Sequence, residues 1–133
     1  MNQTIQKEPK IRCAIYTRND MNEAQRLCCE EFIRGKDGWV CIPTRYDDDS
    51  ESTRYYRPGL LALIRDVNAD KVDCIVMYKF DRLVLSFADF LGLVDEIFEQ
   101  RNVFLASATE PLDTSTETGG ELSKIFELLS KLN

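Results

Sequence analysis

One stretch of the sequence, residues 72–86, constrains the fold most, because it passes directly from an apolar run into a cluster of charges. Its first part, Val72–Tyr78, is almost wholly apolar, and Lys79, Asp81 and Arg82 follow at once. A short continuous apolar run is typical of a buried strand in a parallel sheet. In an open α/β sheet, ligands bind beyond the carboxyl ends of the strands. The sequence therefore predicts functional side chains at this edge.

Strand-like and helix-like segments alternate along the rest of the chain. The predicted strands are residues 11–17, 39–46, 72–78 and 102–108, and the predicted helices are residues 21–34, residues from 58 onward, 87–100 and 121–133. Residues 47–56 have no apolar period and are predicted to form a loop. This alternation predicts an α/β fold, a three-layer sandwich around a four-stranded, mainly parallel sheet.

Local signals indicate where these helices begin and which faces they bury. Asp20 with Glu23, and Thr118 with Glu121, have the spacing of capping boxes, and Pro58 suits the first residue of a helix. The apolar stripes expected to face the sheet are Ala24, Leu27, Cys28 and Phe32 in the first helix and Leu60, Leu61, Ile64 and Val67 in the second. The last helix, expected from about residue 119, carries an apolar stripe that still runs where the sequence stops. We therefore expect a truncated helix that packs on its own sheet or binds a partner.

Length and composition indicate a soluble single domain. The chain has 133 residues and 44% hydrophobic content, enough for one core, and we expect a flexible tail at residues 1–10 and one domain at residues 11–133. Residues 1–10 lack the apolar centre of a signal peptide, and no apolar run reaches the roughly 18 residues of a membrane span. We expect a cytoplasmic protein without a membrane partner, in which all five cysteines are buried free thiols. No metal or cofactor is expected.

Parallel strands would bring several cations to one edge of the sheet. Arg18 follows the first predicted strand, Arg45 ends the second, Lys79 and Arg82 follow the third, and the loop that carries Arg57 borders them. Guanidinium groups match phosphate oxygens as bidentate donors. The net charge of −6 argues against a general nucleic-acid coat, so any DNA binding must come from such a local cluster. Solvated charges at polar strand ends remain an equal alternative.

The acidic run offers a different kind of site. Asp47, Asp48, Asp49 and Glu51, with Asp81, could hold hard cations as in a two-metal nuclease. Neighbouring side chains in such a run point in alternating directions, so a solvated loop is favoured. A nucleotide-binding or response-receiver domain of the same layered shape is disfavoured, because no glycine-rich phosphate loop follows the first strand.

A series of motifs in order resembles the catalytic domain of the serine recombinases, which comprise resolvases, invertases and large serine integrases. The motifs are AIYTR (14–18), EAQR (23–26), YDDDSEST (46–53), RPGL (57–60), VDCIVMYKFDRL (72–83) and ATEPLDTSTETG (108–119). The resemblance extends from about Ile11 to the end of the chain. It implies a resolvase-like fold, duplex DNA as substrate, and a homo-oligomer or an active recombinase as protein partner.

The resemblance also implies a set of site residues and a reaction. The positions that match the family site are Arg18, Gln25, Asp49, Arg57, Asp81 and Arg82. The arginines are expected to hold the scissile phosphate, the glutamine to support them, and the aspartates to orient arginines or to transfer protons. In the family, a serine hydroxyl attacks the phosphate and forms a phosphoserine without a metal.

Two departures from the family pattern affect the expected activity. The family reads Y-x-R-V-S with the serine as nucleophile, whereas Asn19 and Asp20 follow Arg18 here, and the loop is shorter. Leu85 stands where the family has a second arginine in D-R-L-x-R-S, and losing one preorganised donor costs on the order of 3 kcal/mol of transition-state stabilisation. Asp20 is expected to cap the helix rather than to attack. We therefore expect impaired strand cleavage and rejoining, with a non-catalytic dimerisation or regulatory module of a mobile element as the alternative.

Overall fold

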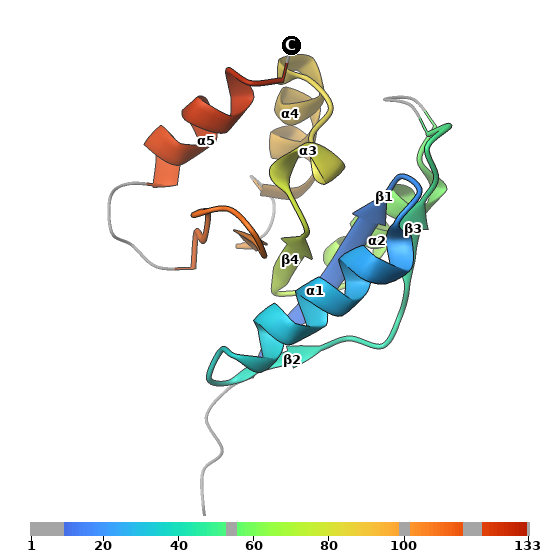
Figure 1. The fold of residues 1–133 in the computed structure, drawn as a ribbon, viewed down its shortest axis with the longest axis vertical. Helices are drawn as coiled ribbons and strands as arrows, with labels where there is room; N and C mark the ends of the chain where they lie inside the picture. Colours follow the sequence, from blue (N-terminus) through green and yellow to red (C-terminus); the bar gives the residue numbers. More distant parts are fainter. Residues whose placement is uncertain (1–9, 53–55, 99–101, 116–120, 133) are drawn as a thin grey trace, which may run out of the picture.

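A parallel sheet forms the centre of the molecule, in a computed structural model that describes residues 10–52, 56–98, 102–115 and 121–132 (Figure 1). The strands are β1 (Ile11–Arg18), β2 (Trp39–Cys41), β3 (Tyr46–Asp48), β4 (Cys74–Met77) and β5 (Phe104–Ser107). Their order is β2-β1-β4-β5, β3 also pairs with β1, and each of these pairs is parallel. The prediction of an α/β fold with a parallel sheet is therefore confirmed. The predicted tail, apart from Lys10, lies outside the described residues.

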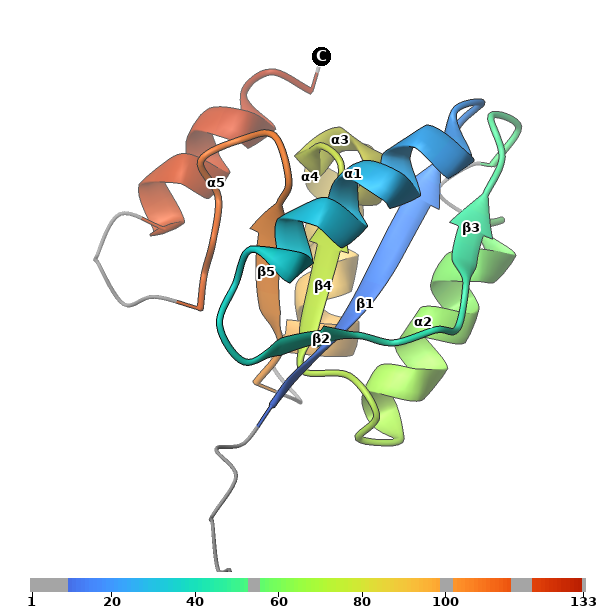
Figure 2. The ribbon, with the colours of Figure 1, turned by 60° about the horizontal axis from the view of Figure 1, so that its bottom comes forward.

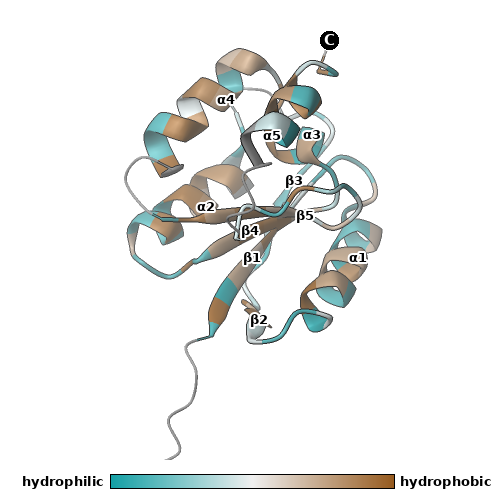
Figure 3. Ribbon diagram, turned by 90° about the vertical axis from the view of Figure 1, so that its left-hand side faces the viewer, coloured by the Kyte–Doolittle hydropathy of each residue, from teal (hydrophilic) through white to brown (hydrophobic). Residues whose placement is uncertain are grey.

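Helices cover both faces of this sheet. They are α1 (Asn22–Arg34), α2 (Pro58–Asn68), α3 (Phe80–Leu83), α4 (Phe87–Leu93), which continues into the π-helical turn η1 (Val94–Phe98), and α5 (Glu121–Leu129). In Figure 2, α1 lies in front of the strands, and α2 and α4 lie behind them. Alternate residues of β1 point to opposite faces of the sheet. Ile15 packs towards α1, and Tyr16 packs in the larger cluster with α2 and α4. Figure 3 shows the largely apolar strands between helices whose surfaces mix hydrophilic and hydrophobic residues.

The sequence prediction of a single strand at residues 39–46 is wrong. The segment forms two short strands on the same side of β1, in which Cys41 pairs with Cys13 and Tyr46 pairs with Tyr16. Pro43 lies between them and has no amide hydrogen to donate to a ladder. The described sheet therefore has five strands instead of four, and β3 extends into the acidic run that the sequence placed in a loop.

The predicted buried faces of α1 and α2 also need correction. In α1 the buried residues are Gln25, Arg26, Cys29 and Ile33, and Leu27 is 63% exposed. Ala24 is exposed too, while Cys28 and Phe32 are half-buried. In α2, Leu60 and Val67 are buried as predicted, but Leu63 lies inside and Leu61 is half exposed. Polar contacts at the sheet edge, described below, turn Gln25 inward and override the apolar pattern of α1.

Asp20 does not cap α1, contrary to the prediction. The residue before the helix is Met21, whose side chain makes no capping hydrogen bond. Asn19 has a positive φ of 92° and donates its amide to the carbonyl of Asp48 at 3.2 Å, so the chain leaves β1 in a tight turn with Asp20 exposed. Pro58 occupies the first turn of α2 as expected. The second predicted capping box includes Thr118, which lies outside the described residues.

The five cysteines are free thiols, but only Cys13, Cys29 and Cys74 are buried, while Cys28 and Cys41 are half-buried. No helix in the described segments is long and apolar enough to cross a membrane.

Candidate functional site

Arg18, Arg57 and Arg82 lie together at the carboxyl-terminal edge of the sheet. Arg18 ends β1, Arg57 directly precedes α2, and Arg82 belongs to α3. The guanidiniums of Arg18 and Arg57 both donate to the main-chain carbonyl oxygen of Arg82, at 3.1 Å from Arg18 Nε and 3.3 Å from Arg57 Nη2. Arg18 Nη2 also donates to the carbonyl of Asp81 at 2.9 Å. Three elements that are distant in sequence thus bring their arginines to one place.

The electrostatics of this cluster favour an anion. The pKa of Arg18 is lowered from its ordinary value, first by burial and then by the positive charge of Arg57, with Arg82 adding to the effect. Like charges held close together repel one another, and a bound anion would relieve that repulsion. Guanidinium donors in such an arrangement suit a phosphate group.

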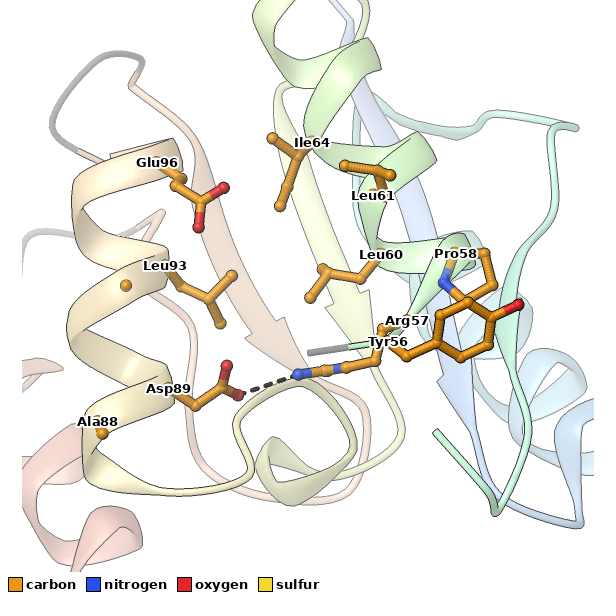
Figure 4. A pocket seen from close by; sticks show the side chains of 11 residues that line it. Tyr56, Arg57, Pro58, Leu60, Leu61, Ile64, Ala88, Asp89, Leu93 and Glu96 are labelled. Atoms are coloured by element: carbon orange, nitrogen blue, oxygen red, sulfur yellow. Dashed lines mark hydrogen bonds and ion pairs between the residues drawn. The ribbon is translucent and has the colours of Figure 1, made fainter. Parts of the chain in front are cut away.

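Arg57 is the buried member of the cluster and is only 5% exposed. Its Nε donates to the Tyr16 hydroxyl at 3.1 Å, its Nη1 pairs with Asp89 at 3.0 Å, and its Nη2 also donates to the carbonyl of Leu83. Figure 4 shows the Arg57–Asp89 pair at the base of a groove of about 440 Å³ between α2 and α4. Since all three guanidinium nitrogens donate to protein acceptors, Arg57 holds neighbouring elements together at this edge and has no nitrogen left for a ligand in this conformation.

Arg82 is the member with unused donor capacity. Its side chain is about a quarter exposed, and its nearest carboxylate oxygen, from Asp81, lies 3.6 Å from Nη1. Its Nε is buried and has no hydrogen-bond partner among the described residues. Arg82 also lines an open pocket of about 530 Å³ together with Asp20, Gln25 and Tyr78. A buried donor without a partner is unusual, and here it belongs to a residue that also lines an open pocket.

Gln25 fixes the main chain of Arg18. Its Nε2 donates to the Arg18 carbonyl at 2.7 Å, and its Oε1 accepts the Arg18 amide at 3.4 Å. This clamp joins the first turn of α1 to the end of β1. It explains why a buried glutamine interrupts the apolar pattern of the helix.

The carboxylates of the site are arranged differently from the sequence expectation. Asp81 is exposed, its carboxylate lies 3.6 Å from Nη1 of the adjacent Arg82, and only its main-chain carbonyl accepts from Arg18. Asp49 is also exposed, but its carboxylate accepts the amide of Glu51 in its own loop. Asp48 is the buried carboxylate of the acidic run.

Asp48 connects β3 with β1 and α2. It accepts the Tyr16 hydroxyl at 2.7 Å, the Gly59 amide at 2.7 Å and the Leu60 amide at 3.0 Å. Because Tyr16 also accepts from Arg57, Asp48 supports the arginine cluster indirectly. The sequence considered Asp48 only as one of several possible cation ligands, although the alternation of β3 places it on the same buried face as Tyr46.

Asp89 was also missed by the sequence prediction. It pairs with Arg57, accepts the amide of Leu85 at 2.8 Å, and donates its own amide to Ser86 Oγ at 3.1 Å. The spacing of Ser86 and Asp89 is that of a capping box, which is the one sequence signal that could have indicated this aspartate.

No serine or threonine lines the pocket beside Arg82 in the part of the chain that the structure describes. Asp20, two residues after Arg18, lines this pocket, and Tyr78 provides the only hydroxyl among the residues that line it. The described residues also contain no group of three or more histidine, cysteine, aspartate or glutamate side chains arranged to hold a metal ion.

Comparison with known proteins gives a family and a fold. The model of the family "Resolvase, N terminal domain" matches residues 11–133. Among solved structures, the N-terminal catalytic domain of TP901-1 integrase is similar with a TM-score of 0.74 and 28% identity, over 90% of this chain and 94% of that one. A resolvase family site-specific recombinase from Streptococcus pneumoniae shares the fold with a TM-score of 0.68, over 92% of this chain and 89% of that one, at 21% identity.

Two curated relatives match over part of their length. The serine recombinase gin of Escherichia phage Mu is 35% identical over 87 residues, which are 65% of this chain and 44% of that protein. The DNA-invertase hin of Salmonella typhimurium is 33% identical over 76 residues, which are 57% of this chain and 38% of that protein. The chain thus spans less than half the length of these relatives.

Proposed function

Because the chain belongs to the resolvase N-terminal domain family, we propose that it is a site-specific recombinase domain whose arginine cluster binds the phosphate backbone of duplex DNA in the cytoplasm. The observation that carries the proposal is the convergence of Arg18 and Arg57 on the carbonyl of Arg82, which concentrates positive charge at the sheet edge. Arg18 and Arg82 contact the phosphate, and Arg57 acts as a positioning residue through its buried bonds. The family relatives gin and hin, a recombinase and a DNA-invertase by name, agree with a DNA substrate.

The remaining predicted residues take supporting parts in this proposal. Gln25 positions Arg18 through its main chain, and Asp81 orients Arg82. Asp49 has no contact with the cluster among the described residues, so we assign its predicted role to Asp48. No cofactor or metal takes part.

We propose further that strand exchange by this chain is impaired. Cleavage in the family requires a serine hydroxyl that displaces one DNA oxygen from phosphorus and stores the bond as a phosphoserine. Asp20 occupies that sequence position, and attack by a carboxylate would give an acyl phosphate, which hydrolyses instead of returning the strand. Leu85 stands where the family has a second arginine, and the absence of that donor reduces transition-state stabilisation by an amount on the order of 3 kcal/mol.

A second candidate function is a non-catalytic dimerisation or regulatory module of a mobile element, which binds another copy or an active recombinase. The observation that favours it is a set of exposed apolar side chains on α4 and α5, namely Phe87, Leu91 and Phe126, each more than half exposed. Large apolar side chains exposed on a protein surface are typical of protein contact sites when they form a patch.

Salt-dependent DNA binding tests the first proposal against the second. The logarithm of the DNA association constant falls linearly with the logarithm of the salt concentration, and each lost phosphate contact makes this slope less steep by about 0.9. Arg82→Ala should therefore weaken binding and give a less steep slope. Arg34→Ala is the matched control, because Arg34 is 69% exposed and its one ion pair among the described residues is with Glu31 in α1. Absence of salt-dependent binding by the unmodified chain would contradict the recombinase proposal and support the interaction module.

A covalent assay tests the proposed impairment separately. The chain is incubated with supercoiled DNA that carries the recombination sites of its element, and protein–DNA adducts are sought on a denaturing gel. We expect binding without adducts, and adduct formation would show that another nucleophile replaces the serine.

A further inference from the structure

A second pocket adjoins the arginine cluster on the side of α5. Its volume is about 390 Å³, and its lining residues are Arg18, Asp81, Val84, Leu85, Lys131 and Leu132. Figures 1 and 3 both place α5 beside α3, with the C-terminal turn approaching the same end of the molecule. Leu128, Leu129 and Leu132 pack against the main core, so the position of this turn is fixed by apolar contacts.

The charges of this pocket are mainly positive. Arg18 reaches it with a guanidinium whose Nη1 makes no hydrogen bond among the described residues, since only Nε and Nη2 donate to carbonyls. Lys131 adds an ammonium group that is 67% exposed, and its nearest carboxylate oxygen, on Glu127, is 4.0 Å away. An exposed pair at that distance contributes little, so it does not compete strongly with a phosphate. The carboxylate of Asp81 also lines the pocket but has its Oδ1 within 3.6 Å of Arg82.

Leu85 gives this pocket its particular significance. It stands where the recombinase pattern has a second arginine, and it contributes an apolar side chain to the same pocket that Lys131 lines. A lysine is a point charge on a flexible stem of four carbons, so it can approach a phosphate from a different element than the arginine it replaces.

We propose that Lys131 of α5 binds a DNA phosphodiester in this pocket together with Arg18 and so supplies the contact that Leu85 lacks. The inference rests on the proposed DNA-binding function and adds to it a residue outside the recombinase motifs. It predicts that the end of α5 takes part in DNA binding as well as in packing.

The test compares Lys131→Gln with Lys71→Gln in binding of a short duplex at several salt concentrations. Lys71 is an exposed lysine just before β4, at the opposite end of the sheet. We expect Lys131→Gln to reduce the slope of log K against log salt by about 0.9, Lys131→Arg to restore it, and Lys71→Gln to leave it unchanged. Because Lys131 is exposed, none of these changes should alter the circular dichroism spectrum.

The outcomes separate this inference from the proposed function. If Lys131→Gln behaves as the unmodified chain while Arg82→Ala loses affinity, the lysine is an ordinary solvated residue and the inference is wrong, but the proposed function stands. If the unmodified chain shows no salt-dependent binding, both are wrong. If Lys131→Gln and Lys71→Gln weaken binding equally, the effect reflects net charge and also overturns the inference.

Discussion

Asp48 joins three parts of the molecule through one buried carboxylate. It accepts hydrogen bonds from Tyr16 in β1 and from the amides of Gly59 and Leu60 in the first turn of α2. Helix amides without an internal partner need such an acceptor, and an anion there also interacts favourably with the helix dipole. Asp48 therefore caps α2 from a neighbouring strand.

Replacing Asp48 by alanine should lower the free energy of unfolding by about 2 to 4 kcal/mol, since it removes a helix cap and leaves buried donors unsatisfied. Urea denaturation measures this value. Asp49→Ala is the control, and its effect should stay within about 0.5 kcal/mol because Asp49 is exposed. Equal effects of the two substitutions would contradict the assignment.

The buried pair of Arg57 and Asp89 allows a second prediction at this scale. Their side chains are 2% and 8% exposed, so removing one partner leaves the other charge uncompensated. Asp89→Ala should cost about 3 to 5 kcal/mol. In a double-mutant cycle with Arg57→Met, the loss of unfolding free energy in the double variant should be smaller than the sum of the two single losses by more than about 1 kcal/mol. Additive effects would mean that the ion pair contributes little.

The sequence placed Arg18, Arg57 and Arg82 at this edge, but it also placed Arg45 there, which instead precedes β3 and pairs with Glu23 and Asp47. Arg57 was expected to hold phosphate, and nothing in its local sequence reveals that Tyr16 and Asp89, from other elements, enclose it. Burial of a single side chain depends on these tertiary contacts. Residue type and strand position were sufficient only for the location of the cluster.

At the scale of elements, Gly59 permits the close approach of α2 to β3. A Cβ atom at this position would lie 2.6 Å from the carbonyl oxygen of Asp47 and 2.8 Å from its carbonyl carbon, both of them backbone atoms that cannot move independently. The helix start must therefore be glycine for the Asp48 cap to form at its observed distances.

Gly59→Ala should lower the free energy of unfolding by about 1 to 3 kcal/mol, because the helix must move away from the strand. Gly92→Ala is the matched helical control. A Cβ atom at Gly92 would meet only Glu96 Oε1, at 4.0 Å, so alanine should stabilise the chain by up to about 1 kcal/mol. Thermal unfolding of both variants compares them, and a shift of Tm in the same direction for both would contradict this prediction.

Strand–helix alternation predicted most elements, and its failures have physical causes. The break between β2 and β3 follows from where each half meets β1, which is a long-range pairing that a local apolar pattern does not encode. The helix α3 has only four residues and therefore no measurable apolar period. The exposed face of α1 was misassigned because Gln25 is held inward by its bonds to Arg18.

At the scale of the whole molecule, the two ends of the sheet carry different charged groups. The carboxyl ends of the strands carry the arginine cluster, whereas at the opposite end Arg12 in β1 makes a bidentate pair with Asp73, before β4, at 2.8 and 3.0 Å. This pair contributes to stability and is distant from the proposed DNA contacts. Lys131 approaches Arg18 only because α5 folds back onto the core, which no local sequence pattern predicts.

The pair of Arg12 and Asp73 predicts a specific acid dependence. The guanidinium lowers the pKa of Asp73 below its ordinary value. A carboxyl whose folded pKa is lowered stabilises the fold above its unfolded pKa, near 4, and loses that contribution as the pH falls through the folded pKa. Asp73→Asn should therefore cost up to about 1 kcal/mol at pH 7, a modest value because both side chains are partly exposed.

The difference between Asp73→Asn and the unmodified chain should shrink as the pH falls below about 4, which urea denaturation at several pH values measures. DNA affinity at pH 7 should not change. A stability difference that is independent of pH, or a loss of DNA affinity, would contradict the separation of the two ends.

The most direct measurement of the central claim follows the arginine Nε–H resonances of the ¹⁵N-labelled chain during titration with a short DNA duplex. The resonances of Arg18 and Arg82 should shift in a saturable manner, while that of Arg34 on the exposed face of α1 should not. Small shifts spread equally over all arginines, or none at Arg18 and Arg82, would contradict a phosphate site at this edge of the sheet.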